Sequence, residues 1–130
     1  MNRLEKKRAL VLGGGGFIGG HLGKKLKSEG FWVRVVDIKK SHEYFKNDEI
    51  SNEYISGDLR DPKLVESIMK VGPDQNHVFD EVYQLAADMG GAGYIFTGEN
   101  DANVMHNSAL INLNVAHEAT KCKVKRLFYS

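Results

Sequence analysis

The feature that most constrains this chain is a glycine loop, Gly13-Gly14-Gly15-Gly16-Phe17-Ile18-Gly19. It follows the short apolar run Ala9–Leu12 and precedes a stretch with helical periodicity, so the order is strand, tight turn and helix. Glycine has no Cβ atom, which lets a ligand approach the backbone closely. A helix that begins there directs free N–H groups and a partial positive charge at that ligand. The loop therefore predicts a binding site for a pyrophosphate.

A second signal is the carboxylate of Asp37, which follows the apolar run Trp32–Val36. A dinucleotide-binding fold places an acidic residue about 20 residues after the glycine loop, where it accepts a hydrogen bond from a ribose hydroxyl. A carboxylate there repels a 2′-phosphate, so Asp37 favours NAD as the cofactor. The nearby cations Lys39 and Lys40 leave NADP as the alternative.

The run of four glycines allows two registers of the loop. Gly14-x-Gly16-x-x-Gly19 fits the usual dinucleotide fingerprint, whereas Gly13-x-x-Gly16-x-x-Gly19 has a wider spacing. Both registers share Gly16 and Gly19. The alternative without a ligand is a plain glycine-rich turn between a strand and a helix. The combination of strand, loop, helix and Asp37 favours a dinucleotide.

Apolar runs alternate with amphipathic stretches along the whole chain, which is typical of βαβ units. The pattern predicts strands at Ala9–Leu12, Phe31–Val36, near Tyr54-Ile55, Glu81–Leu85 and Arg126–Tyr129. It predicts helices at Gly16–Glu29, after Asp61-Pro62 and at Ala102–Lys121. Right-handed crossovers then give a Rossmann-type, doubly wound parallel sheet with strand order 3-2-1-4-5.

Each predicted helix has its own signals. Gly30 is expected to end the first helix, and Asp61-Pro62 to cap and begin the second. Apolar residues are expected to share one face of the first helix at Ile18, Leu22 and Leu26. The same reasoning places Leu110, Leu113 and Ala116 on one face of the last helix.

Composition excludes several classes of protein. The chain has 130 residues, of which 42% are hydrophobic, enough for one domain with a core. Its net charge of +1 argues against a nucleic-acid or membrane partner. No apolar run has the length of a membrane span or of a signal-peptide core. With a single cysteine, Cys122, we expect a protein of the cytoplasm. The histidines show no metal-ligand spacing, so no metal site is expected.

Four ordered motifs resemble the extended short-chain dehydrogenase/reductase family over nearly the whole chain. They are Gly13-x-x-Gly16-Phe17-Ile18-Gly19, Gly57-Asp58-Leu59-Arg60-Asp61, Leu85-Ala86-Ala87 and Lys125-Arg126-Leu127-Phe128-Tyr129-Ser130. The resemblance implies a nucleotide-sugar epimerase, dehydratase or decarboxylase with tightly held NAD. It also selects the register of Gly13, Gly16 and Gly19.

The resemblance further implies which residues bind the cofactor. The loop residues Gly13, Gly16, Phe17, Ile18 and Gly19, together with Asp37, would hold the pyrophosphate and ribose. Asp58 would bond the adenine amino group, the Leu59 backbone would contact the adenine ring edge, and Leu85, Ala86 and Ala87 would line the central part. Asp58 and the segment Leu85-Ala86-Ala87 also have simpler explanations that need no cofactor. Asp58 fits a turn, and Leu85-Ala86-Ala87 fits the end of a buried strand.

A finer resemblance concerns the stretch Leu85–Ile95, which is similar to the corresponding part of GDP-mannose 3,5-epimerases, as are Asn107 and Asn114. The similarity implies that Gly90 lies against the sugar substrate. Ser108 departs from the pattern, because many relatives carry an asparagine there.

The catalytic pair of the family, a tyrosine with a lysine four residues later, is absent from the testable positions. The residues four beyond Tyr44, Tyr54, Tyr83 and Tyr94 are Asp48, Asp58, Ala87 and Gly98. No catalytic residue is therefore expected in the chain. We expect residues 1–130 to be the NAD-binding part of a longer, homodimeric epimerase that acts by transient oxidation of a nucleotide-linked sugar. The alternatives are a dehydratase or decarboxylase of the same family, or an NAD-sensing module without chemistry.

Overall fold

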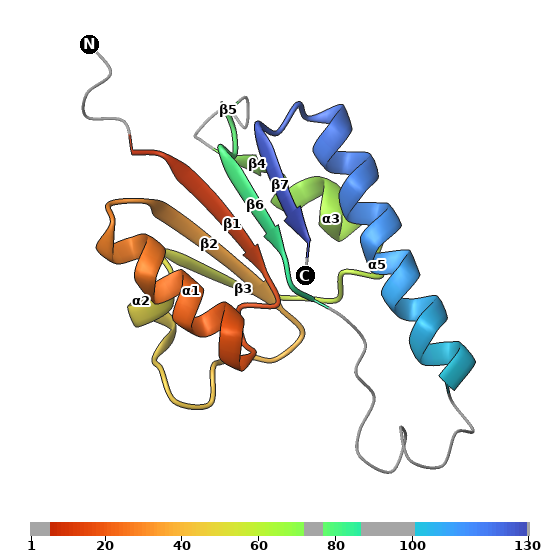
Figure 1. Ribbon diagram of the computed structural model, residues 1–130, viewed down its shortest axis with the longest axis horizontal. Helices are drawn as coiled ribbons and strands as arrows, with labels where there is room; N and C mark the ends of the chain where they lie inside the picture. The colour runs from red at the N-terminus through yellow and green to blue at the C-terminus, as the bar shows by residue number, and fades with distance from the viewer. Residues whose placement is uncertain (1–5, 72–76, 87–100, 130) are drawn as a thin grey trace.

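The computed structural model describes residues 6–71, 77–86 and 101–129. Strands and helices alternate along these residues, as the apolar periodicity predicts (Figure 1). The strands are β1 (Arg8–Leu12), β2 (Trp32–Asp37), β3 (Glu53–Ser56), β4 (Lys70–Val71), β5 (His77–Val78), β6 (Glu81–Gln84) and β7 (Arg126–Tyr129). The helices are α1 (Phe17–Ser28), α2 (Asn47–Ile50), α3 (Pro62–Ile68) and α5 (Asp101–Lys121).

Five of these strands form one parallel sheet in the order β3-β2-β1-β6-β7. With the short β4–β5 hairpin set aside, this is the order 3-2-1-4-5, and the predicted Rossmann-type fold is confirmed. Leu12 at the end of β1 pairs with Val36 of β2 on one side and with Gln84 of β6 on the other. The carboxyl ends of the three central strands therefore meet at one edge of the sheet.

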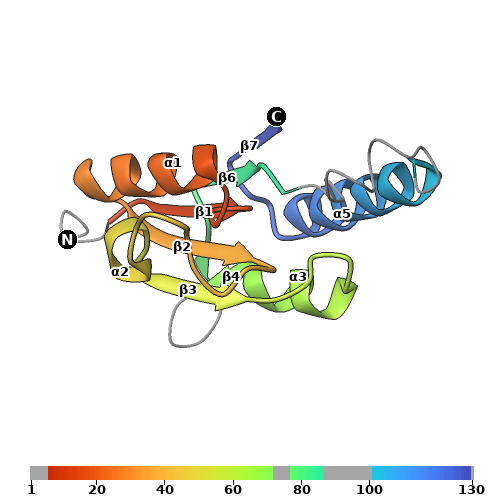
Figure 2. The ribbon, with the colours of Figure 1, turned by 90° about the horizontal axis from the view of Figure 1, so that it is seen from below.

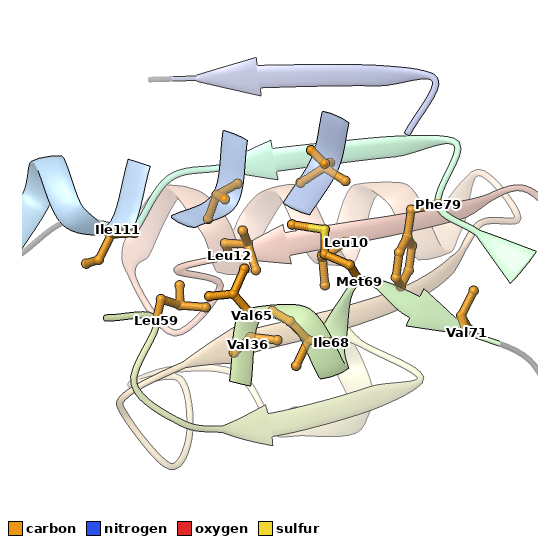
Figure 3. Packing of buried hydrophobic residues seen from close by; sticks show 13 residues of the cluster. Leu10, Leu12, Val36, Leu59, Val65, Ile68, Met69, Val71, Phe79 and Ile111 are labelled. Carbon is orange, nitrogen blue, oxygen red and sulfur yellow. The ribbon is translucent and has the colours of Figure 1, made fainter. Parts of the chain in front are cut away.

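The core lies on both faces of the sheet because consecutive residues of β1 point to opposite sides. Leu10 and Leu12 pack with α3 and α5 in the larger cluster, which Figure 3 shows. Ala9 and Val11 pack with Leu26 of α1 in the smaller one. These four of the five β1 residues are fully buried, which explains why the run from position 9 to position 12 is continuously apolar.

Helix α1 begins one residue later than expected and ends one residue earlier, with Gly16 and Glu29 as its caps. Gly30 stops it as predicted, with a φ of +93°. The expected common face is wrong at its first position, because Ile18 is 71% exposed whereas Leu26 is 4% exposed. Ile18 lies in the first turn of α1, which packs on the glycine loop through the buried Gly19 instead.

The start of α3 follows the local chemistry of its sequence. The Asp61 carboxylate accepts a hydrogen bond from the Lys63 N–H at 3.0 Å, and Pro62 occupies the first helical position. The prediction of an Asp61 cap followed by proline is confirmed.

Helix α5 starts at Asp101 and covers β6 and the neighbouring strands through a different stripe from the one expected. Among the α5 residues whose side chains the structure describes, 106–121, the buried apolar ones are Ile111, Val115 and Ala119, whereas Leu113 is 68% exposed. A spacing of four drifts by 40° per step around a helix, whereas a spacing of three drifts by 60° in the opposite direction. The stripe at a spacing of four therefore stays narrower, and it faces the sheet.

Three short elements were not predicted. Helix α2 lies within a polar connection, and its one fully buried apolar residue is Ile50. The β4 and β5 strands form a hairpin of two residue pairs, Lys70 with Val78 and Val71 with His77. Elements this short carry no periodicity, so the sequence pattern cannot reveal them.

Candidate functional site

The carboxyl ends of β1 and β6 form the switch point of the sheet, because the chain leaves β1 toward one face and β6 toward the other. The glycine loop follows β1, and Leu85 and Ala86 follow β6. The Leu85 N–H donates a hydrogen bond to the Leu12 carbonyl at 2.9 Å, which holds the two strand ends together. Helix α5 extends beyond this edge of the sheet (Figures 1 and 2). Ligands of doubly wound folds bind at this edge.

Gly13 makes the turn out of β1. Its φ is +87°, a conformation that favours glycine, and its N–H donates to the Val36 carbonyl at 2.7 Å. A Cβ atom on Gly13 would lie 2.8 Å from the Ala86 nitrogen. The turn, the end of β2 and the end of β6 are therefore packed backbone to backbone.

Gly19 and Gly16 play different parts in the loop. A Cβ atom on Gly19 would lie 2.4 Å from the Gly13 carbonyl oxygen, so close packing of α1 on the loop requires a glycine there. Gly16 has a φ of −82°, and a Cβ atom on it would meet only the Gly13 oxygen, at 3.4 Å. Neither strain nor crowding explains a glycine at position 16, and a ligand that closely approaches the backbone would do so.

The first turn of α1 suits an anion. Gly16 caps the helix without a side-chain hydrogen bond, and the first turn contains no acidic residue. The N–H groups of this turn have no partner within the helix, and the dipole makes this end positive. The side chains of Phe17 and Ile18 are 67% and 71% exposed here. A pyrophosphate can accept hydrogen bonds at this end of the helix.

Asp37, the last residue of β2, is 9% exposed and holds the loop from the side. Its two carboxylate oxygens accept hydrogen bonds from the Gly15 N–H and the Lys39 N–H, both at 2.9 Å. A carboxylate has about four acceptor positions, so Asp37 can still accept from ribose hydroxyls. The Tyr54 hydroxyl donates to the Lys39 carbonyl at 2.9 Å. Burial, and then the charge of Asp37, raise the pKa of Tyr54 to about 12.

Asp58 and Leu59 lie in the turn after β3. Arg60 Nη2 lies 2.6 Å from Asp58 Oδ2, and this hydrogen bond is the main reason why the pKa of the Asp58 carboxyl lies below its usual value. Asp58 thus organises the turn, as its simpler interpretation proposes. The Leu59 side chain belongs to the core, and its carbonyl accepts a hydrogen bond from Asn114 Nδ2 of α5 at 3.2 Å. That bond fixes the turn against α5.

Sequence reasoning missed Gln84, the last residue of β6. Its side chain is almost fully buried and hydrogen-bonds to Ala86 and to Asn112 of α5. The signal was an amide placed two residues after the buried Val82, on the face of the strand expected to be apolar. Ala87 and Gly90, also predicted as site residues, lie outside the described residues.

Two kinds of feature are absent from the described residues. Within 6–71, 77–86 and 101–129, no group of three histidine, cysteine or acidic side chains could hold a metal ion. In the same part of the chain no helix is long and apolar enough to cross a membrane.

Strand order and loop geometry together define a Rossmann-type protein. The chain belongs to the NAD dependent epimerase/dehydratase family, whose model matches residues 9–130.

Two curated relatives show the range of activities among similar proteins. The chain is 39% identical over 126 residues to GDP-mannose 3,5-epimerase 1 of Oryza sativa subsp. indica, an alignment of 97% of this chain and 31% of the relative. It is 27% identical over 135 residues to UDP-glucuronic acid decarboxylase 1 of Danio rerio, covering 100% of this chain and 28% of the relative. The chain thus spans about a third of the length of the curated relatives it matches.

Solved structures share the fold. UDP-glucose 4-epimerase of Thermotoga maritima, solved with UDP-glucose, aligns with a TM-score of 0.76 at 24% identity, over 94% of this chain and 37% of that one. A Bordetella bronchiseptica enzyme solved in complex with NAD aligns with a TM-score of 0.71 at 23% identity, over 98% and 38% of the two chains.

Proposed function

We propose that this chain is the NAD-binding part of a nucleotide-sugar epimerase similar to GDP-mannose 3,5-epimerase. The observation that carries the proposal is the difference between the loop glycines. The fold itself requires Gly13 and Gly19, whereas Gly16 leaves open the space that a pyrophosphate would fill. The 39% identity to the rice epimerase supports the choice of reaction within the family.

In this proposal the N–H groups of Phe17 and Ile18 bind the pyrophosphate at the positive end of α1. The Gly16 N–H donates to the Gly13 carbonyl at 3.1 Å, so Gly16 contributes open space rather than a donor. Gly13 and Gly19 keep the turn and the helix close enough for that contact. Phe17 and Ile18, both largely exposed, border the same end of the site.

The remaining residues hold the two ends of the cofactor. Asp37 accepts hydrogen bonds from the adenosine ribose hydroxyls, and its negative charge disfavours a 2′-phosphate, so NAD is the proposed cofactor. Asp58 and Leu59 contact the adenine, and the segment Leu85-Ala86-Ala87 lines the central part. Gly90 lies against the sugar.

When bound, NAD would supply reversible hydride transfer at a sugar carbon. The residues of this chain bind and orient the cofactor, and the proton transfers fall to a tyrosine–lysine pair in a further part of a longer, homodimeric protein. The chain aligns with only about a third of the length of its curated relatives, which supports the proposal of a longer protein. The proposed substrate is a GDP-linked hexose.

The test uses protein expressed from the complete reading frame. It is incubated with GDP-mannose, UDP-glucose and UDP-glucuronic acid, and the products are identified by NMR. Epimerised GDP-sugar is the expected product. Release of carbon dioxide from UDP-glucuronic acid would overturn the assignment as an epimerase in favour of a decarboxylase. NAD binding without turnover of any of the three sugars would favour a sensing module.

A further inference from the structure

Gln84 uses its whole side-chain amide on two neighbours. Its Nε2 donates to the Ala86 carbonyl at 2.8 Å and to Asn112 Oδ1 at 2.9 Å. Its Oε1 accepts from the Ala86 N–H at 3.2 Å. Both backbone polar groups of Ala86 are therefore paired with one side chain, which is 2% exposed.

The position of Ala86 makes this pairing important for the site. The ladder between β6 and β1 ends at Gln84, so the backbone of Ala86 has left the sheet. The Ala86 nitrogen lies 2.8 Å from the place where a Cβ atom of Gly13 would be. The amide of Gln84 thus holds a piece of backbone in contact with the turn that begins the glycine loop.

An aliphatic residue would satisfy the packing at this position but not the hydrogen bonds. Val82, on the same face of β6, is fully buried and purely apolar. A buried amide loses its hydration, and only complete pairing offsets that cost. The pairing at Gln84 is directed to Ala86, and a second bond to Asn112 anchors the amide to α5.

We propose that Gln84 is a positioning residue, whose amide clamps the Ala86 backbone against Gly13 and so fixes the β6 wall of the dinucleotide site. The proposal rests on the proposed NAD-binding function. Asn112 accepts a hydrogen bond from the Gln84 amide and so holds it against α5. The position of the Ala86 backbone at the site therefore depends on the position of α5, through the Gln84 side chain.

The test measures NAD affinity by isothermal titration calorimetry in protein from the complete reading frame. Gln84→Met keeps the side-chain length but removes three hydrogen bonds, and we expect its Kd for NAD to rise about tenfold. The Ala86 amide should also exchange its hydrogen faster in this variant. Ser51→Ala is the matched control, because Ser51 is 3% exposed and its hydroxyl donates to the Asn47 carbonyl at 2.7 Å. Ser51 lies just before the amino end of β3, the outermost strand of the sheet, and not at the carboxyl ends where the cofactor site lies. This variant should therefore lose stability and keep its NAD affinity.

Gln84→Glu gives a readout that a purely structural role would not move. The neutral acid can donate to the Ala86 carbonyl and accept from its N–H, whereas the carboxylate can only accept. Its NAD affinity relative to the wild type should therefore recover as the pH is lowered.

The outcomes separate the two proposals. If the wild-type protein does not bind NAD, the proposed function fails and the role of Gln84 fails with it. If the wild type binds NAD and Gln84→Met binds it equally well, the role of Gln84 alone is overturned. If Gln84→Met does not fold, the test falls to Gln84→Glu. An NAD affinity of Gln84→Glu that keeps the same ratio to the wild-type affinity at every pH then overturns the role of Gln84.

Discussion

Arg34 donates a hydrogen bond from Nη1 to the Ile68 carbonyl at 2.7 Å, so a guanidinium lies buried at the C-terminal end of α3. The same nitrogen donates to the Lys70 carbonyl at 2.8 Å. The rings of Trp32 and Phe79 lie with their centroids 5.4 Å from the Arg34 Cζ atom. One charged side chain of β2 thus joins the end of α3 to β4, which sequence reasoning did not foresee.

Replacing this guanidinium should destabilise the fold. Arg34→Met leaves the buried Ile68 carbonyl and the partly buried Lys70 carbonyl without this donor and removes the ion pair with Glu53. We expect the free energy of unfolding to fall by about 2 to 3 kcal/mol. The stability of Arg34→Lys should lie between those of Arg34→Met and the wild type, because an ammonium group keeps the charge but cannot reproduce the planar guanidinium. Urea denaturation followed by circular dichroism measures both. Arg126→Met is the control, since Arg126 is 71% exposed in its pair with Glu81 and should contribute little. Equal midpoints for Arg34→Met and the wild type would contradict the structural role.

The glycines of α1 separate cofactor binding from stability. Gly16→Ala should cost at most about 1 kcal/mol of stability, as a helix cap, but should weaken NAD binding at least tenfold, on the order of 1.4 kcal/mol. Gly23→Ala should lower stability and leave NAD affinity unchanged, because a Cβ atom there would lie 2.4 Å from the Ile50 carbonyl oxygen, away from the loop. Calorimetric titration with NAD, together with thermal denaturation, distinguishes the two. Undiminished NAD affinity in Gly16→Ala would argue against the pyrophosphate at this position.

The sequence predicted those parts of the fold that depend on periodicity or on local chemistry. The β1 strand was found because all its apolar residues are buried, and the start of α3 because Asp61 and Pro62 are sufficient signals by themselves. Partners distant in the sequence were missed. Arg34 is a plain polar residue in its strand until α3 and β4 pack beside it, and the amide of Gln84 has a purpose only beside Ala86.

Replacement of the Asp37 charge should change cofactor selectivity. Asp37→Asn keeps one oxygen acceptor for the loop but removes the negative charge that would repel a 2′-phosphate. We expect the preference for NAD over NADP, measured as the ratio of the two Kd values, to fall about tenfold, or about 1.4 kcal/mol. Asp48→Asn, an exposed carboxylate of α2, is the charge-matched control. A wild-type protein that binds NADP more tightly would overturn the assignment of NAD itself.

Asp80 links the amino ends of three strands and should make stability depend on acid pH. Its carboxylate accepts hydrogen bonds from the Arg8 N–H at 2.7 Å and from Lys125 Nζ at 3.0 Å. Burial acts to raise the pKa of Asp80, but these hydrogen bonds and the nearby cations outweigh it and lower the pKa below its ordinary value. The ionised form is therefore favoured in the folded state.

A lowered folded-state pKa gives a stabilisation that is fully present above the unfolded-state pKa of about 3.9 and is lost as the pH falls through the folded-state value. We expect Asp80→Asn to lose stability at pH 7 and to show a flatter decline below about pH 4 than the wild type. Urea midpoints measured from pH 7 down to pH 3 test this. Asp48→Asn is again the control and should follow the wild-type curve. Parallel curves for Asp80→Asn and the wild type would show that this carboxylate does not bind the strand ends together.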